Sequence, residues 1–406
     1  MCGIIGYVGT RDVVPVLIGG LKKLEYRGYD SAGIAVVDGN GVQVVRAEGK
    51  LSNLETKLEA APLKGTFGMG HTRWATHGKP NENNAHPHRD CTGKVVVIHN
   101  GIIENFLPLK QRLQKSGHEF KTETDTEVVA HLIEENMKDG TKFVDAVRKT
   151  LKELEGHYAL VMIDGNEPGT IVAAKQGPPL VVGLGENENI IASDVAPLLA
   201  YTRNIIYLED GEYAVVDQKN ATFYDQNDQT IEREPKRILW DAVMAEKEGY
   251  RHYMLKEIHE QPRAVRDTFT GRMFEESGEI FFNDLQFTAD DWAKIKKVHI
   301  VACGTSWHSG LVGKFLLEDA ARIPIEVDYG SEYRYRNPII DDSTLVIGVT
   351  QSGETADTIA GMQEAQKRGA KLITSCNVIG AAATRRSDGV TYTQAGPGIG
   401  GAVGSC

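Results

Sequence analysis

The most reactive group in the sequence is a cysteine at position 2. Met1 is followed by Cys2-Gly3-Ile4-Ile5-Gly6, and a small second residue favours removal of the initiator methionine. Cys2 would then carry an α-amino group with a reference pKa of about 7.7 to 8.0, which can serve as general base for its own thiol. A frayed chain end with an idle cysteine is the alternative. The start of the chain therefore allows nucleophilic catalysis by Cys2.

Polar residues of three further segments could complete a site for acyl transfer; the segments are Gly70–Gly78, His99–Asn105 and Glu123–Glu127. Arg73 could hold a carboxylate through two hydrogen bonds and Asp125 could pair with an ammonium, so together they would recognise the head of an amino acid. Asn100-Gly101 offers a side-chain amide and a backbone N–H for an oxyanion hole. Each piece also has an ordinary structural reading as a turn, a surface ion pair or a helix cap.

Two hydroxyl-rich loops in the second half of the chain could bind an anion. Cys303-Gly304-Thr305-Ser306 and Thr350–Thr355 each follow an apolar strand and precede a helix. Hydroxyls and backbone amides at the start of a helix favour a phosphate, and ligands of open α/β sheets lie beyond the carboxyl ends of the strands. Turn formers and helix caps are the alternative reading. We expect both loops at one edge of a sheet.

The bulk composition is typical of a soluble enzyme with more than one domain. The chain has 406 residues, which exceeds what one core usually supports, and its net charge of −11 argues against nucleic acid or anionic membranes as partners. It shows neither a membrane span nor a signal sequence, so we expect a cytoplasmic protein. Five scattered cysteines without C-x-x-C suggest neither disulfides nor zinc, and His86-Pro87-His88 reads as a loop. The sequence predicts no metal site.

Short strands and amphipathic helices must position the first set of residues. Apolar residues at helical spacing predict helices from Val13 to Leu24 and from Val128 to Met137, the second capped by Thr124 or Asp125. The mixture predicts stacked layers of antiparallel sheet and helix. The predicted strands are Gly3–Val8, Ala32–Val37, Val95–His99, Leu160–Asp164, Ile171–Ala174, Leu180–Leu184 and Tyr213–Val216.

The second half of the chain has a different order of predicted elements. A charged stretch from Gln226 to about Glu248 predicts a linker, and Arg251–Gln261 predicts a polar helix that ends before Pro262. Beyond Lys297, apolar strands alternate with helices, which indicates parallel βαβ units and a small doubly wound domain. The predicted strands are Val298–Ala302, Ile325–Asp328, Leu345–Thr350 and Leu372–Thr374, and the helices are Trp307–Ala321 and Ala356–Arg368.

In order and spacing, the segments from Cys2 to about residue 220 resemble the glutaminase domain of the N-terminal-nucleophile amidotransferases. Within them, Tyr26–Gly33 is similar to the branch of that family that makes glucosamine 6-phosphate. The resemblance implies a four-layer αββα fold with Cys2 as nucleophile and Asn100 and Gly101 as oxyanion hole. It further implies glutamine binding by Arg73, Thr76, His77 and Asp125, with ammonia gated by Trp74.

The two hydroxyl-rich loops resemble those of sugar isomerase domains, and Ser331–Arg336 between them is similar to glucosamine 6-phosphate synthases. The implied reaction turns L-glutamine and fructose 6-phosphate into glucosamine 6-phosphate and glutamate, and ends with an aldose/ketose isomerisation. The resemblance implies no metal or organic cofactor, and a homodimer for the intact enzyme. Cys303 is expected to be a packed loop residue. The implied phosphate ligands are Ser306, Thr350, Gln351, Ser352 and Thr355.

The expected organisation combines an α+β domain with an α/β domain. It comprises a glutaminase domain at 2–225, a linker at 226–250, a helical connector at 251–296, a first sugar isomerase (SIS) subdomain at 297–394 and an atypical glycine-rich tail at 395–406. The family has two SIS subdomains, and the isomerase acid/base residues and lysine lie largely in the second. We therefore expect a C-terminally truncated chain with an incomplete isomerase half.

Two further expectations follow from that incompleteness. No closing helix follows Val390–Thr393, so we expect exposed apolar surface there, although a flexible tail on a complete domain is the alternative. The alternative function is a sugar-phosphate-binding or regulatory remnant with glutaminase activity only. Phosphoribosyl amidotransferases and asparagine synthetases share the Cys2 chemistry, but the pyrophosphate- or ATP-binding motif of their acceptor domains is not visible here.

Overall fold

The computed structural model describes residues 2–25, 30–39, 41–73, 81–238, 250, 252–270, 272–274, 279–280, 282, 285 and 287–395. The chain divides into two compact units, Met1–Leu239 and Trp240–Cys406. Among the described helices, none combines the length and the apolar character needed to cross a bilayer.

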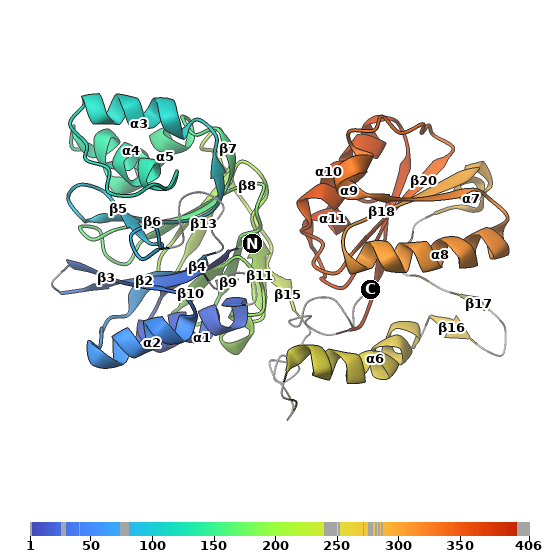
Figure 1. Ribbon diagram of the computed structural model, residues 1–406, viewed down its shortest axis with the longest axis horizontal. Helices are drawn as coiled ribbons and strands as arrows, with labels where there is room; N and C mark the ends of the chain where they lie inside the picture. The colour runs from blue at the N-terminus through green and yellow to red at the C-terminus, as the bar shows by residue number, and fades with distance from the viewer. Residues whose placement is uncertain are drawn as a thin grey trace. The chain divides into compact units, whose positions relative to one another are not determined.

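The first unit consists of two stacked antiparallel sheets between layers of helices (Figure 1). One sheet has the strand order β15 (Lys236–Arg237), β11 (Asn204–Tyr207), β9 (Val181–Leu184), β10 (Asn189–Ala192), β1 (Gly3–Val8), β4 (Phe67–Arg73), β2 (Ser31–Asp38) and β3 (Gly41–Glu48). The other has the order β14 (Thr230–Ile231), β13 (Ala221–Tyr224), β12 (Glu212–Val216), β8 (Ile171–Gln176), β7 (Gly156–Asp164), β6 (Val95–Ile103) and β5 (His88–Arg89). The outer layers are α1 (Val13–Leu24) and α2 (Leu51–Ala60) on one side and α3 (Phe106–Lys115), α4 (Glu127–Met137) and α5 (Phe143–Leu151) on the other. The predicted αββα architecture is confirmed.

Strand β6 is apolar at consecutive positions because both of its faces are buried. Val96 and Ile98 belong to the core between the two sheets, whereas Val95 and Val97 belong to the core under α3, α4 and α5. Because successive side chains of a strand point to opposite faces, a strand in the middle of four layers buries both faces. The same holds for β7, which places Val161 in one core and Leu160 in the other.

Helix α1 begins and ends at the predicted residues, whereas the predicted cap of α4 is wrong. The Asp12 carboxylate accepts a hydrogen bond from Val14 N and caps α1. The N-cap of α4 is Thr126, without a side-chain capping bond. The Asp125 carboxylate instead accepts a hydrogen bond of 2.7 Å from Ile103 N. Asp125 therefore ties α4 to β6.

The first unit also extends beyond residue 225, where the linker was expected. β14 pairs with β13, and β15 pairs with β11. Charged residues such as Lys236 can occupy these strands because both lie at sheet edges, where one face and one side remain in solvent. Their two-residue length leaves little periodicity for sequence reasoning to detect.

The second unit begins with a helical segment: α6 (Tyr253–Phe269), a hairpin of β16 (Met273–Phe274) and β17 (Glu279–Ile280), and α7 (Ala289–Lys294). The predicted end of α6 before Pro262 is wrong, because the helix continues to Phe269. A proline removes one N–H donor, and a helix that is largely exposed can leave the orphaned carbonyl to water.

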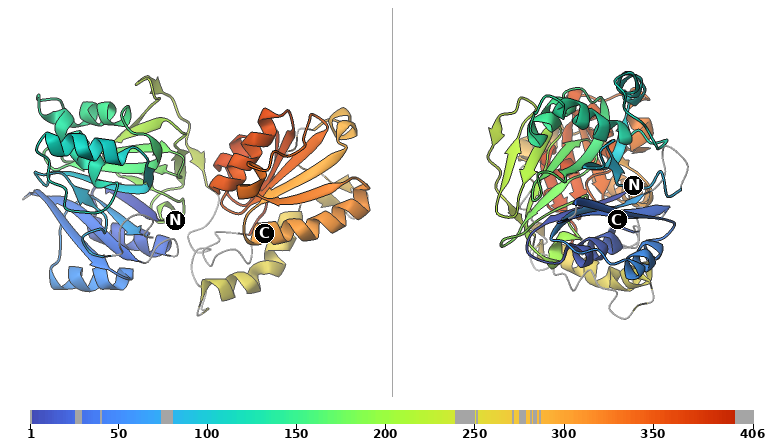
Figure 2. Two further views of the ribbon diagram at one scale, coloured as in Figure 1. Left: turned by 45° about the horizontal axis from the view of Figure 1, so that its top comes forward. Right: turned by 90° about the vertical axis from the view of Figure 1, so that its left-hand side faces the viewer.

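A parallel sheet forms the core of the second unit, with the order β19 (Ile325–Tyr329), β18 (Lys297–Ala302), β20 (Thr344–Thr350), β21 (Lys371–Cys376) and β22 (Gly389–Tyr392). One face is covered by α8 (Thr305–Ala321), and the other by α9 (Gly330–Tyr333), α10 (Ala356–Lys367) and α11 (Ala382–Arg385) (Figure 1 and Figure 2). Helices on both faces make the sheet doubly wound, as predicted.

The edge beside β22, where exposed apolar surface was expected, is partly covered by the segment that precedes the sheet. Leu285 forms a bridge with Gly389 and Arg272 donates a hydrogen bond to the Tyr392 carbonyl, so the preceding segment covers this edge. Exposed apolar side chains lie in that covering segment, where Ile280 is 64% exposed, and on α8, where Phe315 is 68% and Leu316 67% exposed. This cover was not predicted because it comes from residues that precede the strand in the sequence.

Candidate active site

Strand β1 places Cys2 at the rim of the first sheet. β1 lies between β10 and β4, and Gly3 pairs with Thr72, so the next residues outward on the two strands are Cys2 and Arg73. Ser193 Oγ accepts a hydrogen bond of 3.0 Å from Ile4 N. A Cβ on Gly3 would lie 2.6 Å from Thr72 Oγ1, so only glycine fits beside the nucleophile. Cys2 itself is partly exposed.

Asn100 on β6 contacts Cys2 directly. Its Nδ2 donates a hydrogen bond of 3.0 Å to the Cys2 carbonyl, while its Oδ1 lies 3.0 Å from His71 Nε2. Because Oδ1 can only accept, His71 carries its proton on Nε2. Burial lowers the pKa of His71 to about 3, so the ring is neutral. His71 therefore fixes which end of the Asn100 amide faces Cys2, and sequence reasoning assigned it no role.

Gly101, the next residue, has a backbone conformation that other residues rarely adopt. Its φ is +128°, and a Cβ there would lie 2.0 Å from the His157 carbonyl oxygen. The residue is exposed, next to the buried Asn100. The sequence prediction for Asn100 and Gly101 thus corresponds to one amide and one backbone N–H on consecutive residues, next to Cys2.

Arg73 interacts electrostatically with both Cys2 and Asp125. The Arg73 side chain is buried, and burial lowers the pKa of its guanidinium while Cys2 and Asp125 oppose that shift. Asp125 is buried as well. This arrangement offers a cation and an anion to the two ends of an amino-acid head group. Trp74, Thr76, His77 and the segment Tyr26–Tyr29 lie outside the described residues.

A cluster of buried histidines supports these residues, and sequence reasoning missed it. Thr126 Oγ1 lies 2.9 Å from His99 Nδ1 and 3.0 Å from His86 Nε2, and the rings of His71 and His86 are 4.2 Å apart. Burial lowers the pKa of His86, of His88 to about 3, and of His99, which keeps the cluster neutral. Thr126 and Asp125 are therefore held against β6 by polar contacts.

In the second unit, the two hydroxyl-rich loops follow the neighbouring strands β18 and β20. The chain crosses to opposite faces after these strands, so the loops lie at the point where the strand order reverses, which is where doubly wound sheets bind ligands. Thr358 Oγ1, in the first turn of α10, donates a hydrogen bond of 3.6 Å to Cys303 Sγ and joins the first loop to the helix that follows the second. Cys303 is thus in contact with a neighbouring element, as a packed residue would be.

The second loop is organised by its own hydroxyls. Thr350 Oγ1 accepts a hydrogen bond of 3.2 Å from Gly353 N and lies 3.3 Å from Thr355 Oγ1. Ser352 Oγ accepts from Glu354 N, and Gln351 and Ser352 are both partly exposed. In the first loop, Ser306 is buried within the first turn of α8. The loops therefore place hydroxyls and two helix N-termini at one sheet edge.

Comparisons with known proteins match both units. A glutamine amidotransferase domain model matches residues 71–200, and an SIS domain model matches residues 292–406. Glutamine–fructose-6-phosphate aminotransferases (isomerizing) of Caldanaerobacter subterraneus subsp. tengcongensis and Clostridium acetobutylicum are each 48% identical over 98% of the chain. The chain is a homologue of these aminotransferases. It spans 65% of the length of each of these aminotransferase relatives.

Solved structures support the fold alone. The glutamine phosphoribosylpyrophosphate amidotransferase from B. subtilis, complexed with ADP and GMP, is similar with a TM-score of 0.50 and 18% identity, over 92% of this chain and 81% of that one. A structure of the allosteric regulatory enzyme of purine biosynthesis has a TM-score of 0.51 over 92% of this chain and 80% of its own, also at 18% identity. The aminotransferase homologue thus has an N-terminal-nucleophile amidotransferase fold and a parallel-sheet SIS domain.

Proposed function

We propose that the chain, after removal of Met1, hydrolyses L-glutamine at Cys2 and passes the ammonia to fructose 6-phosphate, giving glucosamine 6-phosphate and glutamate. The observation that carries the proposal is the 3.0 Å hydrogen bond from the Asn100 amide to Cys2. It joins the nucleophile to a donor suited to an oxyanion. The names of the relatives supply the sugar substrate, and the two hydroxyl-rich loops offer a place for its phosphate.

In the proposed glutaminase reaction, the residues around Cys2 act one after another. The α-amino group of Cys2 takes the thiol proton, and the thiolate attacks the glutamine carboxamide carbon. The Asn100 amide has two N–H donors, so one can hold the Cys2 carbonyl while the other, with Gly101 N, stabilises the oxyanion. The amide nitrogen takes a proton and leaves as ammonia. Water then hydrolyses the thioester to glutamate and restores Cys2.

The clamp on glutamine would use charge at both ends of its head group. Arg73 binds the α-carboxylate through paired hydrogen bonds, and Asp125 accepts the α-ammonium. Thr76 and His77 belong to the same proposed clamp, and Trp74 to the passage of ammonia. The Ile103 N–H bond fixes Asp125 Oδ2, and Oδ1, which accepts only a long bond of 3.5 Å from Thr126 Oγ1, keeps a lone pair for the substrate.

The sugar half of the proposal assigns the phosphate of fructose 6-phosphate to the two loops. Its ligands would be Ser306, Thr350, Gln351, Ser352 and Thr355, with the N-termini of α8 and α10 adding a favourable dipole. Ammonia would add to the C2 carbonyl of the sugar and water would leave to give an imine, and proton transfer from C1 to C2 would complete the isomerisation to the amino sugar. The proposed chemistry requires no metal or organic cofactor.

The second candidate function is a sugar-phosphate-binding or regulatory protein that has glutaminase activity only. It is kept because the chain spans 65% of the length of the aminotransferases it resembles, so glutamine hydrolysis and amino-sugar synthesis need separate tests. A homodimer and a cytoplasmic location remain predictions from the sequence.

One experiment separates the two functions. Glutamate and amino sugar are measured side by side in the purified chain, with and without fructose 6-phosphate, for the wild type and for Cys2→Ala. The proposal expects both products from the wild type and neither from Cys2→Ala. Glutamate without amino sugar would favour the second candidate, and glutamine hydrolysis by Cys2→Ala would refute the glutaminase assignment altogether.

A further inference from the structure

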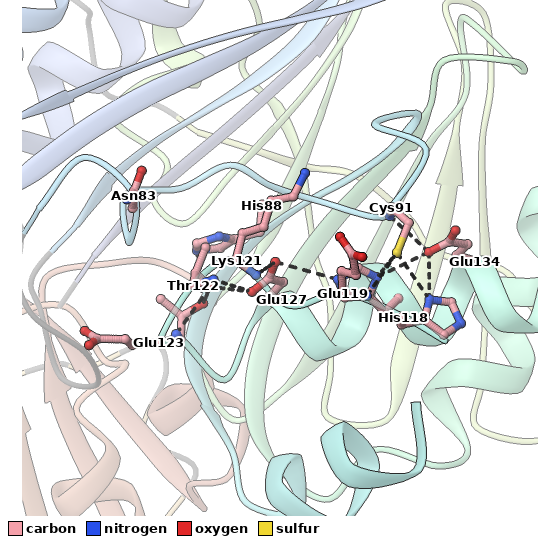
Figure 3. Close-up of polar contacts among 12 residues, drawn as sticks. Asn83, His88, Cys91, His118, Glu119, Lys121, Thr122, Glu123, Glu127 and Glu134 are labelled. Carbon is pink, nitrogen blue, oxygen red and sulfur yellow. Dashed lines mark hydrogen bonds and ion pairs between the residues drawn. The ribbon is translucent and has the colours of Figure 1, made fainter. Parts of the chain in front are cut away.

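A cluster of metal-ligating side chains lies in the first unit, apart from the residues around Cys2. It contains Cys91 from the turn between β5 and β6, His118 from the segment between α3 and α4, and His131 and Glu134 from α4 itself. Their donor atoms all lie within 4.8 Å of one another. Figure 3 shows Cys91, His118 and Glu134 pointing toward one another. The proposed glutaminase mechanism uses none of them.

The sulfur–nitrogen distances in this cluster match those of ligands around a tetrahedral ion, and the oxygen–nitrogen distances are somewhat shorter. Cys91 Sγ lies 3.7 Å from His118 Nδ1 and 3.5 Å from His131 Nδ1. Glu134 Oε2 lies 2.9 Å and 3.2 Å from the same two nitrogens. Zinc bonds of about 2.3 Å to sulfur and about 2.0–2.2 Å to nitrogen and oxygen separate tetrahedral S and N ligands by about 3.5 Å and N and O ligands by about 3.4 Å.

The outer nitrogens of both histidines face carboxylates. His118 Nε2 lies 2.6 Å from Glu135 Oε2, and His131 Nε2 lies 3.6 Å from Glu127 Oε1. Glu127 is itself fixed by N–H bonds of 2.8 Å from Lys121 and Thr122 (Figure 3). A carboxylate on the outer nitrogen is the usual support of a metal-bound histidine, because it leaves the inner nitrogen's lone pair for the metal. Both rings are turned with Nδ1 toward Cys91.

Burial and accessibility suit a bound ion. The two imidazole side chains are 2% and 1% exposed, so they are held rigidly, whereas Cys91 is exposed and offers a path of entry. The Cys91 thiol and the Glu134 carboxylate lie beside two imidazoles, and a shared cation would stabilise this set of ligands.

The alternative is a network held by protons. A protonated His118 could bridge Glu134 and Glu135, since it lies within hydrogen-bond distance of both. That arrangement explains the histidine and the two carboxylates. It also uses both Nδ1 atoms and Cys91 N as donors to Glu134 Oε2, but it gives no role to the Cys91 sulfur, which lies 3.7 Å and 3.5 Å from the same two nitrogens.

We propose that Cys91, His118, His131 and Glu134 bind a structural Zn²⁺ ion in tetrahedral geometry. A thiolate with two imidazoles and a carboxylate selects zinc over the hard cations magnesium and calcium, and four protein ligands leave no open position for catalysis. The ion would tie the β5–β6 turn and the segment before α4 to α4 itself. Since Asp125 and Thr126 immediately precede α4, it would also stiffen the support of the proposed glutamine clamp.

The first test measures zinc in protein purified without chelators. The Cys2→Ala variant is the parent, so that the proposed nucleophile cannot hold zinc. We expect about one zinc per chain by elemental analysis, and less than about a tenth of that in Cys91→Ser or Glu134→Gln made in the same parent. Cys303→Ser and His157→Gln are the matched controls, since Cys303 lies in the other unit and the side chain of His157 is 72% exposed. Equal zinc in all variants would mean binding elsewhere and would overturn the assignment.

The second test replaces zinc with Co²⁺, whose spectrum reports the ligands. We expect the visible bands of a four-coordinate ion and a near-ultraviolet thiolate-to-cobalt band that Cys91→Ser abolishes. Removing zinc from the parent should lower Tm by about 5 °C or more, and Cys91→Ser, altered at an exposed residue, should fold with the Tm of the metal-free parent. A wild-type chain that neither contains zinc nor takes up Zn²⁺ or Co²⁺ stoichiometrically would establish the proton network instead.

Discussion

The side-chain amide of Asn100 donates a hydrogen bond of 3.0 Å to the backbone carbonyl of Cys2. The same amide accepts from His71, whose ring is buried and neutral. The donor at the nucleophile is therefore oriented before any substrate arrives, which is the condition for electrostatic stabilisation without reorganisation.

Replacing Asn100 should impair turnover more than binding. We expect Asn100→Ala to lower kcat for glutamine hydrolysis by about 10²- to 10³-fold with little change in KM, because the lost donor acts on the transition state. Steady-state glutamate release measures both constants. Asn227→Ala, in the exposed turn between β13 and β14, is the control. A rise in KM at constant kcat would instead place Asn100 among the glutamine-binding residues.

Arg73→Lys should impair glutamine binding more than turnover. Lysine keeps the charge but cannot form the paired hydrogen bonds of a guanidinium with a carboxylate, so KM for glutamine should rise by about 10- to 100-fold. The comparison variant is Arg11→Lys, whose side chain is 58% exposed and paired with Glu188. An unchanged KM with a lower kcat would show that Arg73 acts on Cys2 rather than on glutamine.

Gly101→Ala tests the backbone donor. A Cβ would lie 2.0 Å from the His157 carbonyl oxygen, so the strand must shift and carry the N–H with it. We expect about a 10²-fold loss of kcat and a lower Tm. Gly140→Ala is a matched control, because its φ of +76° is also positive but nothing lies within 4 Å of the added carbon. If both variants lose only stability, the N–H of Gly101 has no catalytic role.

Acid should destabilise the first unit below pH 6.5. His71 and His88 have folded-state pKa values of about 3, below the ordinary value of 6.5, so the unfolded chain takes up protons that the folded chain does not. The free energy of unfolding should therefore fall between pH 6.5 and pH 5, by up to about 1 kcal/mol per pH unit for each histidine. Glu127, with a pKa lowered from 4.5 to about 2, adds to the loss only at lower pH. Denaturant unfolding at several pH values measures the slope, and a flat profile from pH 7 to pH 5 would contradict the neutral cluster.

Thr350→Val should weaken sugar-phosphate binding. Thr350 Oγ1 accepts from Gly353 N, so valine leaves that N–H without its partner and loosens the loop. Calorimetry with fructose 6-phosphate should show about a tenfold weaker Kd, and Thr350→Ser, which keeps the hydroxyl, should restore it. Equal binding by the valine and serine variants would remove the hydroxyl from the proposed phosphate site.

Sequence reasoning succeeded where local pattern and burial agree. The bounds of β1 and α1 follow from an apolar run and a helical repeat that both face a core. The strands of the second unit were recognisable because a parallel sheet buried on both faces requires continuous apolar runs. The edge strands β14 and β15 were missed, since strands of two residues carry no such pattern.

Contacts between segments that are far apart in the sequence could not be predicted from it. His71 and Asn100 come from different sheets, and only the stacking of those sheets brings the imidazole to the amide. The cluster at Cys91 was missed for the same reason: its ligands come from a turn, a loop and a helix, and only His131 and Glu134 share a recognisable helical spacing. A search for a compact ligand motif finds nothing in such an arrangement.

The central position of β1 also sets an order of events during synthesis. β1 pairs with β4 on one side and β10 on the other, and Ile4 bonds to Ser193, so the sheet around the amino terminus cannot be complete before about residue 193 has left the ribosome. At 5–20 residues per second, that gives roughly 10 to 40 s in which a methionine aminopeptidase can act before the sheet is complete. Excision of Met1 and folding would then be separated in time, and the nucleophile would be unmasked before the sheet that presents it has closed.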